Sequence, residues 1–266
     1  MLQPGNKLDL HQYPAAAGCN DCVMQQVLLL SRPNGNGGSR DPRFIEGVLA
    51  SLDLFQDVTP RNIGEVASQS RTQQVRRGTV VCNRGHRLPG VIVMAYGMAK
   101  LGLRRGDGDG KVLRFLCANE TFGVASVLLD RPCPLDLVAV ADSMITILPA
   151  RPLLRLLELD PKFARNLSLG LAGTVLGMVT EFEASVQCSA VQRLASYLGS
   201  LARPVEAAQA GTVRLPASKT LIAARLGITK ETMSRLLREL AERGLISVSG
   251  RKIDILDSAG LALVAS

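Results

Sequence analysis

Several features that define common classes of protein are missing from this chain of 266 residues. It has only two histidines, His11 and His86, and no histidine-rich metal-binding motif. It also has neither a nucleophile elbow of the Gly-x-Ser-x-Gly type nor a phosphate-binding P-loop. No apolar run is long enough to span a membrane, and the polar N-terminus lacks the basic-then-apolar order of a signal peptide. The sequence therefore argues against an enzyme and against a membrane protein, and it predicts a cytoplasmic location.

Composition and charge point to a folded protein with a polyanionic partner. Hydrophobic residues make up 47% of the sequence, enough for two modest domains with cores of their own. The net charge is +8, which would also suit an acidic protein or a membrane surface. Residues 203–266 contain ten Lys or Arg against six Asp or Glu. Part of the basic excess therefore lies in the segment that carries the strongest motif.

That motif is a helix-turn-helix pattern at residues 218–240. Small Ala223 stands where two crossed helices would approach most closely, and Gly227 can adopt the positive φ of a tight turn. Thr229 can cap the N-terminus of the second helix. Apolar residues occupy the positions that two crossed helices bury: Ile222, Leu226, Ile228, Met233 and Leu236.

The second predicted helix has a polar face that suits the major groove of DNA. Arg235 can read guanine with two hydrogen bonds, Glu231 can accept from a cytosine amine, and Ser234 can serve a phosphate or a base. An ordinary helical hairpin with a solvated charged face would show a similar pattern. The predicted DNA-contacting residues are Lys219, Thr229, Lys230, Glu231, Thr232, Ser234, Arg235, Arg238 and Arg251.

A two-stranded wing is predicted directly after this hairpin. Gly244 can end the second helix, and residues 247–256 alternate in polarity about a Gly250-Arg251 turn. A helix-turn-helix followed by a wing is typical of DNA-binding domains. The combination therefore favours double-stranded DNA as the partner over the plain hairpin.

These residues also carry a family resemblance. Residues 221–240, followed by Gly244-Leu245-Ile246, closely resemble the DNA-binding signature of the CRP/FNR family of bacterial transcription regulators. The triplet Glu231, Ser234 and Arg235 is similar to that of the FNR and FixK branches. The resemblance implies a homodimer that binds a palindromic, TTGAT-like site and works with RNA polymerase, as an activator. The residues themselves do not distinguish activation from repression.

The domain organisation predicted for the chain is α+β. Residues 1–42 form a flexible N-terminal arm, 43–158 an effector β-roll of the jelly-roll, cyclic-nucleotide-binding-like type, 159–202 a dimerisation helix and 203–266 the winged helix-turn-helix. Short helices are expected at residues 44–54 and 57–67. Strands separated by glycine-rich turns are expected at 72–82, 90–97, 98–104, 111–117 and 138–148.

The effector of the predicted β-roll is unknown from the sequence. In cyclic-nucleotide-binding relatives an acidic residue holds the ribose and an arginine the phosphate, but Val124 and Leu135-Asp136 occupy those places here. A carboxylate beside a phosphate repels it, so cyclic nucleotide binding is not expected, and Arg131 is the only nearby substitute. A haem-based gas sensor would need a ligand such as His86, which reads more simply as a polar loop residue. A regulator that responds to a cyclic nucleotide or to a gas through haem stays the alternative.

The N-terminal arm contains the one chemical motif outside the DNA-binding domain, Cys19-x-x-Cys22. Such a pair can bind a metal, hold part of an iron–sulfur cluster, cycle as a dithiol or have no role. The resemblance implies two further cluster ligands, but Leu28 or Leu29 and Thr146 stand where they are expected. The ligand set is incomplete, so the pair is predicted to act as thiols in redox sensing, if it acts at all. A redox enzyme built on the pair is the alternative from another class.

The chain has four further cysteines, and it has one long helical segment after residue 160. Cys82, Cys117, Cys133 and Cys188 could supply substitute cluster ligands, but two lie in apolar strands and one on a helix, where a small buried residue is the commoner role. A cytoplasmic chain is not expected to form structural disulfides. From Pro161 to about Leu201 an uninterrupted helix is predicted. Its apolar stripe can pack on the β-roll of its own chain or pair with the same helix of a second subunit, which the resemblance favours. The predicted interface residues are Leu167, Leu171, Val175, Met178 and Phe182.

Overall fold

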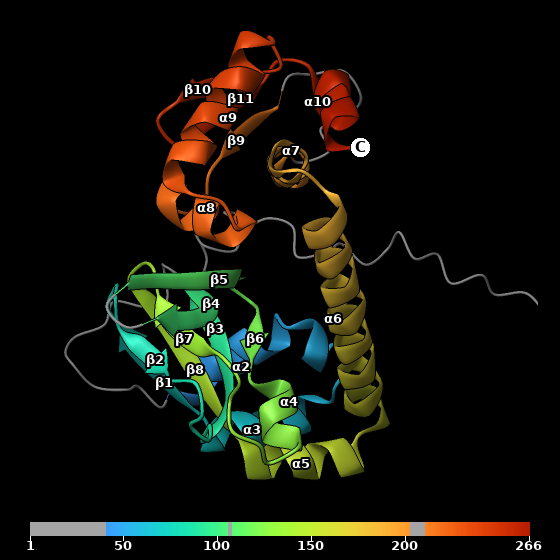
Figure 1. The fold of residues 1–266 in the computed structure, drawn as a ribbon. Coiled ribbons are helices and arrows are strands. Elements are labelled where there is room, and N and C mark those ends of the chain that lie inside the picture. The colour runs from blue at the N-terminus through green and yellow to red at the C-terminus, as the bar shows by residue number, and fades with distance from the viewer. Residues whose placement is uncertain (1–40, 106–107, 203–210) are drawn as a thin grey trace, which may run out of the picture.

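The computed structural model describes residues 41–105, 108–202 and 211–266. Figure 1 shows a β domain below and a DNA-binding-type domain of helices and short strands above, joined along one side by a single long helix. This is the α+β organisation that the sequence predicts. The segment with Cys19 and Cys22 lies outside the described residues, as does His11.

Three helices begin with the same local signal, a capping side chain followed by proline. The side-chain oxygen of the first residue accepts hydrogen bonds from the first turn, and proline fits there because its missing N–H would have no helical partner. These helices are α2 (Pro42–Ala50), α3 (Pro60–Gln69) and α6 (Pro161–Gln187), which start at Asp41-Pro42, Thr59-Pro60 and Asp160-Pro161. The first predicted helix is shorter than expected, because α2 ends at Ala50 and a 3-10 turn, η2 (Asp53–Phe55), follows it.

Two four-stranded antiparallel sheets form the β domain. One has the strand order β1-β8-β3-β6 and the other β2-β7-β4-β5. Their strands are β1 (Arg71–Val75), β2 (Val80–Cys82), β3 (Gly90–Tyr96), β4 (Met98–Arg105), β5 (Gly108–Cys117), β6 (Thr121–Phe122), β7 (Asp136–Ala139) and β8 (Ser143–Pro149). Apolar side chains from both sheets fill the space between them.

The predictions of single strands at residues 72–82 and 138–148 are wrong. Each segment forms two strands, and the two strands belong to different sheets: β1 and β2 in the first case, β7 and β8 in the second. Gly78, at φ 86°, turns the first segment, and Asp142 stabilises the crossing by accepting a hydrogen bond from the backbone N–H of Arg77 at 2.8 Å. The alternation of side chains shows that a segment is extended, but it does not show where the segment changes sheets.

Helices cover the outer face of the β1-β8-β3-β6 sheet and the end of the β domain. A second apolar cluster lies under α2, α3 and α5 (Ala150–Leu159), and Phe163 and Leu167 from the start of α6 join it. Within it the rings of Phe55 and Phe163 lie 5.2 Å apart, so η2 is packed directly against α6. The sequence did not predict α5 or the short helix α4 (Val124–Leu128).

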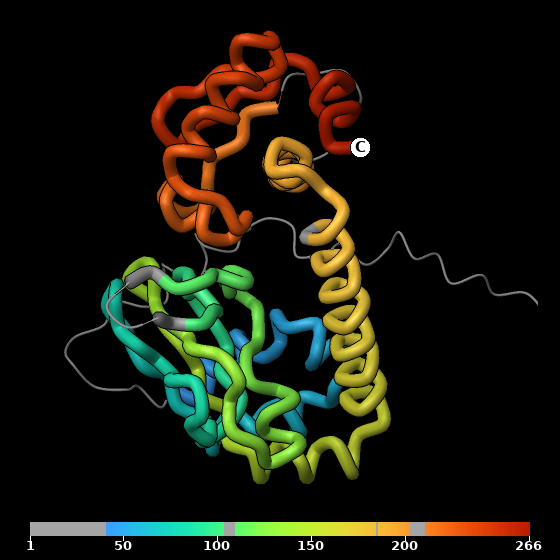
Figure 2. Tube along the Cα trace, in the orientation of Figure 1, coloured from blue at the N-terminus to red at the C-terminus, as the bar shows by residue number. Residues whose placement is uncertain are grey.

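The uninterrupted helix predicted from Pro161 to Leu201 is wrong. The chain breaks after α6 and turns sharply into α7 (Ala190–Leu201), which Figures 1 and 2 show end-on above α6. Ser189 and Gln192 form a capping box, in which each side chain accepts a hydrogen bond from the other residue's backbone N–H. This cap starts a new helix, and the apolar periodicity that led to the prediction continues on both sides of it.

The upper domain is built around α8 (Lys219–Leu226) and α9 (Lys230–Glu242). A three-stranded sheet of order β10-β11-β9 packs with them, formed by β9 (Thr212–Arg214), β10 (Ile246–Ser249) and β11 (Lys252–Ile255). The chain ends in α10 (Ser258–Ala265), which packs on α7. Leu194, Ala195 and Leu198 of α7 are buried in the core of this domain, so α7 is structurally part of it.

Candidate DNA-binding site

The helix-turn-helix forms with the local geometry that its sequence predicts. Ser218 caps α8, and Gly227 ends it at φ 69° in the left-handed region that favours glycine. Thr229 caps α9, its hydroxyl oxygen accepting from the backbone N–H of Thr232 at 3.1 Å. The predicted turn and cap are therefore confirmed.

Helix α9 separates apolar and polar residues onto opposite sides. Its inward side chains, Met233, Leu236, Leu237 and Leu240, are all buried, as predicted. Its outward side chains are exposed: Lys230, Glu231, Ser234, Arg235 and Arg238. Because the apolar side fixes the rotation of α9, the polar residues form one continuous face that is available to a ligand.

Glu231 is placed to stay ionised on this face. Its carboxylate accepts hydrogen bonds from its own backbone N–H and from the Thr229 side chain, and these bonds lower the pKa of Glu231 below its ordinary value. The position in the first turn of α9 also favours negative charge through the helix dipole. An ionised carboxylate is an acceptor only, which suits an amine donor such as that of cytosine.

An open groove of about 170 Å³ lies between α8, α9 and the wing. It is lined by Lys219, Ser234, Leu237, Arg238, Ala241 and Val248. Three predicted DNA contacts therefore line one groove: Lys219 at the start of α8, and Ser234 and Arg238 of α9. Lys219 is half-buried there, so its stem packs while its ammonium group reaches the rim.

The wing forms as predicted about Gly250 and Arg251, and β9 adds an unpredicted third strand. Arg251 also has a structural role, separate from any contact with DNA. Its guanidinium donates from Nε and Nη2 to the carbonyl oxygen of Leu215, at 3.1 and 2.7 Å, and from Nη2 to that of Pro216 at 2.8 Å. The tip of the wing thereby holds the segment that leads into α8.

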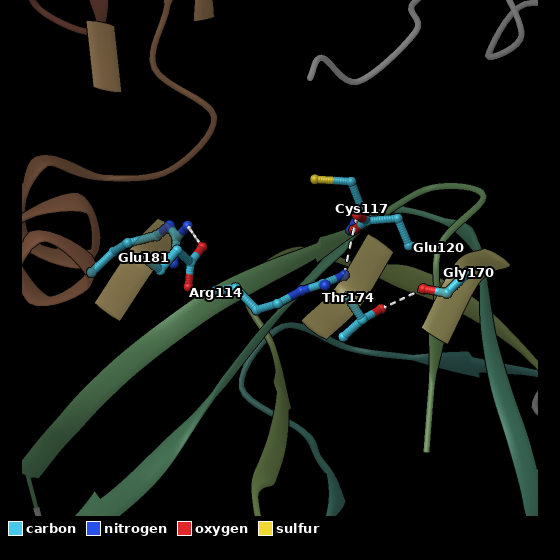
Figure 3. Close-up of polar contacts among 7 residues, drawn as sticks. Arg114, Cys117, Glu120, Gly170, Thr174 and Glu181 are labelled. Atoms are coloured by element: carbon cyan, nitrogen blue, oxygen red, sulfur yellow. Dashed lines mark hydrogen bonds and ion pairs between the residues drawn. The ribbon is translucent and has the colours of Figure 1, made fainter. Parts of the chain in front are cut away.

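Two arginines that sequence reasoning missed anchor the helix-turn-helix to the helices below it. Arg193 of α7 donates to the carbonyl oxygens of Leu226, at the end of α8, and of Cys188, at the helix break. Arg225 of α8 pairs with Glu181 of α6 at 2.7 Å, and Figure 3 shows the contact at Glu181. The partners lie 33 and 44 residues apart, so no local sequence pattern could reveal these pairs.

The upper domain also rests on the edge strand β5 of the β domain. Helix α8 packs against β5, and Phe115 and Cys117 of this strand join the core of the upper domain. Glu120 fixes the end of β5 by accepting from Arg114 at 3.2 Å and from the backbone N–H of Cys117 at 2.6 Å (Figure 3). Tyr197 of α7 is half-buried in the same region, and its partial burial raises the pKa of its phenol to about 12. The two domains are thus in direct contact through residues of one sheet.

Two positions of the β domain lack the side chains that the sequence analysis expects to hold a cyclic nucleotide. Val124, where relatives of the nucleotide-binding type carry an acid, is an apolar residue of α4, and Leu88 packs directly over Gly123. Asp136 is buried, and its carboxylate accepts from the backbone N–H of Arg84 at 2.9 Å. A carboxylate at this position repels a phosphate.

Metal and haem sites are also tested by the structure. In the described ranges, no group of three or more His, Cys, Asp or Glu side chains could hold a metal ion. His86 is an exposed loop residue, as predicted. Thr146, which stands where a cluster ligand was expected, is fully buried in β8. Cys188 lies at the break between α6 and α7, half-buried, and Cys82 and Cys133 are buried as expected.

The predicted dimer face on α6 divides into two parts. Leu167 is buried against the β domain of its own chain, so its assignment to a second subunit is corrected by the structure. Leu171 is half-buried there, and its place in a dimer interface stays a prediction. Farther along, Val175, Met178 and Phe182 are 59%, 63% and 69% exposed. The first turns of α6 pack on η2 and α5, whereas the later turns extend past the β domain.

Two family models match the chain, one for each domain. Residues 72–160 match the cyclic nucleotide-binding domain, and residues 192–264 match the Crp-like helix-turn-helix domain. The second match begins within α7, in agreement with the packing of that helix. Among the described helices, none is long and apolar enough to cross a membrane.

Individual relatives come from both main branches of this group. The chain is 24% identical over 220 residues, 82% of its length, to the CRP-like cAMP-activated global transcriptional regulator of Mycobacterium tuberculosis, covering 98% of that protein. It is 23% identical over 251 residues to the transcriptional activator protein FnrA of Stutzerimonas stutzeri, covering 94% of this chain and 93% of that one. The structure of FixK2 from Bradyrhizobium japonicum shares the fold, with a TM-score of 0.65, 24% identity, and coverage of 74% of this chain and 98% of that chain.

A β-roll joined by a long helix to a winged helix-turn-helix defines a DNA-binding transcription regulator and not an enzyme. This chain belongs to the CRP/FNR family of these regulators. Its relatives include CRP-like and FNR-like members at similar low identity, so the match does not assign it to either branch.

Proposed function

We propose that two copies of this chain form a dimer that binds a palindromic, TTGAT-like DNA site in the cytoplasm and acts there with RNA polymerase. The observation that carries the proposal is the exposed polar face of α9, with Glu231, Ser234 and Arg235 in its first two turns. Arg and Glu side chains one helical turn apart can address neighbouring base pairs in a major groove. Such side chains select a sequence, which an architectural DNA-binding protein would not require.

The dimer is supported by the exposed part of α6. Val175, Leu176, Met178 and Val179 are 49–63% exposed although all are apolar. A continuous apolar surface on a long helix is unfavourable in water, and pairing with the same helix of a second chain would bury it. The side of α6 that bears Glu181 is already occupied by the ion pair with Arg225. A parallel helix pair therefore leaves both DNA-binding domains in place on the outside.

A two-fold axis along the paired helices explains why the site should be a palindrome. It would place two α9 helices in successive major grooves, with half-site centres about 34 Å apart, or one turn of DNA. We therefore expect one dimer to bind one palindrome. A monomer on a single half-site would lose half of the base contacts and most of the phosphate contacts.

The test is a titration of labelled duplexes followed by fluorescence anisotropy and sedimentation. A palindromic TTGAT duplex, the same duplex with one half-site scrambled, and a fully scrambled duplex are compared at two salt concentrations. We expect one dimer per palindrome and affinity on the order of a thousandfold above scrambled DNA. Equal affinity for the half-site duplex, bound by a monomer, would refute the proposal.

For the signal, we propose oxidation of Cys19 and Cys22 as thiols. Support comes from the incomplete set of cluster ligands and from the poor fit of the β domain to a cyclic nucleotide. The double variant Cys19→Ser/Cys22→Ser should bind DNA normally under reducing conditions and lose its response to oxidant. Anaerobic protein with about four irons per chain, and a visible absorption that bleaches in air, would instead establish a cluster. The alternative, a cyclic nucleotide, is favoured by the cAMP-activated relative and predicts that added cAMP raises DNA affinity.

A further inference from the structure

The interior of the β domain holds two cysteine thiols side by side. Cys82 ends β2, and Cys133 lies in the loop between α4 and β7. Both belong to the apolar cluster between the two sheets, with exposed fractions of 7% and 1%, and both are unbridged thiols. They are 51 positions apart in sequence, so only the fold brings them together.

The two thiols lie close enough to interact with each other. The Cys82 thiol donates to the carbonyl oxygen of Asn83 at 3.3 Å, and the Cys133 thiol donates to that of Leu135 at 3.2 Å. Burial, together with this neighbour, raises the pKa of Cys82 to about 12. At neutral pH the Cys82 thiol is therefore protonated and carries no charge into the apolar interior.

The backbone fixes this arrangement. Two backbone hydrogen bonds join Cys133 to the turn that follows Cys82. The N–H of Gly85 donates to the carbonyl oxygen of Cys133, and the N–H of Cys133 donates to that of His86, both at 2.8 Å. Gly85 has φ 84°, which allows the turn that follows Cys82 to fold back over Cys133. The sulfurs of two unbridged thiols lie farther apart than the roughly 2.05 Å of a disulfide, and side-chain rotation can close that difference when the backbone already holds the two residues together.

We propose that Cys82 and Cys133 are a modification site that closes to a reversible intrachain disulfide when a small oxidant of the peroxide class reaches them. One thiol, as its thiolate, attacks a peroxide oxygen, the O–O bond breaks, and a sulfenic acid and one water result. The second thiol attacks the sulfenic sulfur, the S–S bond forms, and the S–O bond breaks as a second water leaves. Two thiols thus lose two electrons and two protons, and one hydrogen peroxide becomes two waters.

The burial of both thiols selects a small oxidant. The Arg87 guanidinium donates to the carbonyl oxygen of Asp130 at 2.9 Å and pairs with the Asp130 carboxylate, which joins the two loops beside the cysteines. Leu88 packs on the same cluster. A bulky disulfide cannot enter such a site without local opening, whereas peroxide is close to water in size. Because only the thiolate reacts, closure should be slow at neutral pH and faster as the pH rises.

Closure would reinforce the sheet on which the DNA-binding domain rests. Cys82 and the loop of Cys133 lie at the β2-β7 side of the β2-β7-β4-β5 sheet, and β5 at the opposite edge contacts α8. The bond would tie a long loop and restrict the unfolded chain, so the oxidised β domain should melt at a higher temperature. This inference does not depend on the proposed DNA site or on Cys19 and Cys22.

The test uses the full chain with the other four cysteines replaced, Cys19→Ser, Cys22→Ser, Cys117→Ser and Cys188→Ser. Hydrogen peroxide is added to the folded protein, and intact mass, thiol content and tryptic peptides are followed at several pH values. We expect a loss of 2 Da, consumption of both thiols, and a link between peptides 78–84 and 115–155. Reductant should reverse all three, the melting temperature should rise by roughly 5 °C, and the rate should increase with pH.

The matched controls are Cys82→Ala and Cys133→Ala in the same background. Each should lose the link and the rise in melting temperature; if either fails to fold, the linked peptide from the parent chain still decides the question. A gain of 32 Da on one cysteine with the other left reduced would overturn the proposal. So would a bond between two chains, or thiols that react only after the protein is unfolded.

Discussion

Helices α9 and α6 have apolar stripes of the same kind, but their surroundings differ. On α9 every residue of the stripe is buried in its own domain, with Met233 and Leu240 at 0% exposure. On α6 the stripe is buried at Leu167 and becomes more than half exposed from Val175 onward. Periodicity identifies which residues share a face of a helix, whereas the surrounding elements determine what covers that face.

The largest effect is expected from damage to the covered stripe. Leu240→Ala removes a fully buried side chain, and we expect the free energy of unfolding to fall by about 2–5 kcal/mol through lost burial and a cavity. Met178→Ala is the matched control on α6, with a loss below about 1 kcal/mol. Urea unfolding at a chain concentration too low for dimers measures both. Equal losses of unfolding free energy in the two variants would contradict the conclusion that the stripe of α9 is covered and that of α6 is not.

The exposed stripe should instead control association. Val175→Glu/Met178→Glu places two charges per chain in the proposed helix pair, and we expect the dissociation constant of the dimer to rise about 100-fold or more. Sedimentation equilibrium measures this change. Thr180→Glu, an exposed residue away from the stripe on the same helix, is the control and should leave the dimer intact. If the double variant still forms dimers, the dimer interface lies elsewhere on the chain.

The polar face of α9 can be separated into base and phosphate contacts. Arg235→Ala should weaken binding to the specific site by about 1–3 kcal/mol and relax selection at one guanine. Lys219→Ala should weaken binding to all DNA sequences equally. It should also reduce by about one the slope of the logarithm of affinity against the logarithm of salt concentration. Anisotropy titrations against single-base variants of the palindrome distinguish the two. If Arg235→Ala affects random DNA as strongly as specific DNA, the assignment of its base contact is incorrect.

A smaller effect is expected at the start of α6. Asp160 accepts hydrogen bonds from the N–H groups of Lys162 and Phe163 at 3.0 and 3.2 Å and from the Asn62 amide at 2.8 Å. Burial acts to raise the pKa of Asp160, but the bonds from Asn62, Phe163 and Lys162 outweigh it and lower the pKa. The stabilisation is therefore present above the ordinary pKa of aspartate and is lost as the pH falls through the lowered folded-state value.

Asp160→Ala should reduce the free energy of unfolding by about 0.5–2 kcal/mol near neutral pH. The difference from the unaltered protein should shrink as the pH is lowered, in thermal melts recorded across the acidic range. Asp160→Asn keeps an oxygen acceptor for the cap and should lose less. A loss that does not change with pH would mean that the carboxylate charge contributes nothing.

Sequence reasoning was most successful where the information is local. The turn at Gly227, the cap at Thr229 and the two faces of α9 were all predicted, because each depends on residues within about one helical turn. It was less successful where an element is defined by distant partners. The segment 138–148 was predicted as one strand because alternation continues through it, and the missed helix α5 is held by contacts with α3 and α6.

The sequence by itself determined the helix-turn-helix, the wing about Gly250, and the residues that α9 presents to solvent. Tertiary structure decided that α7 belongs to the DNA-binding domain, that Arg251 holds the segment before α8, and that Cys82 meets Cys133. The physical reason is how far apart in the sequence the interacting residues lie. Caps, glycine turns and amphipathic faces arise from neighbouring residues, whereas a covered stripe, an ion pair such as Arg225 with Glu181, or a thiol contact exists only after distant segments have packed.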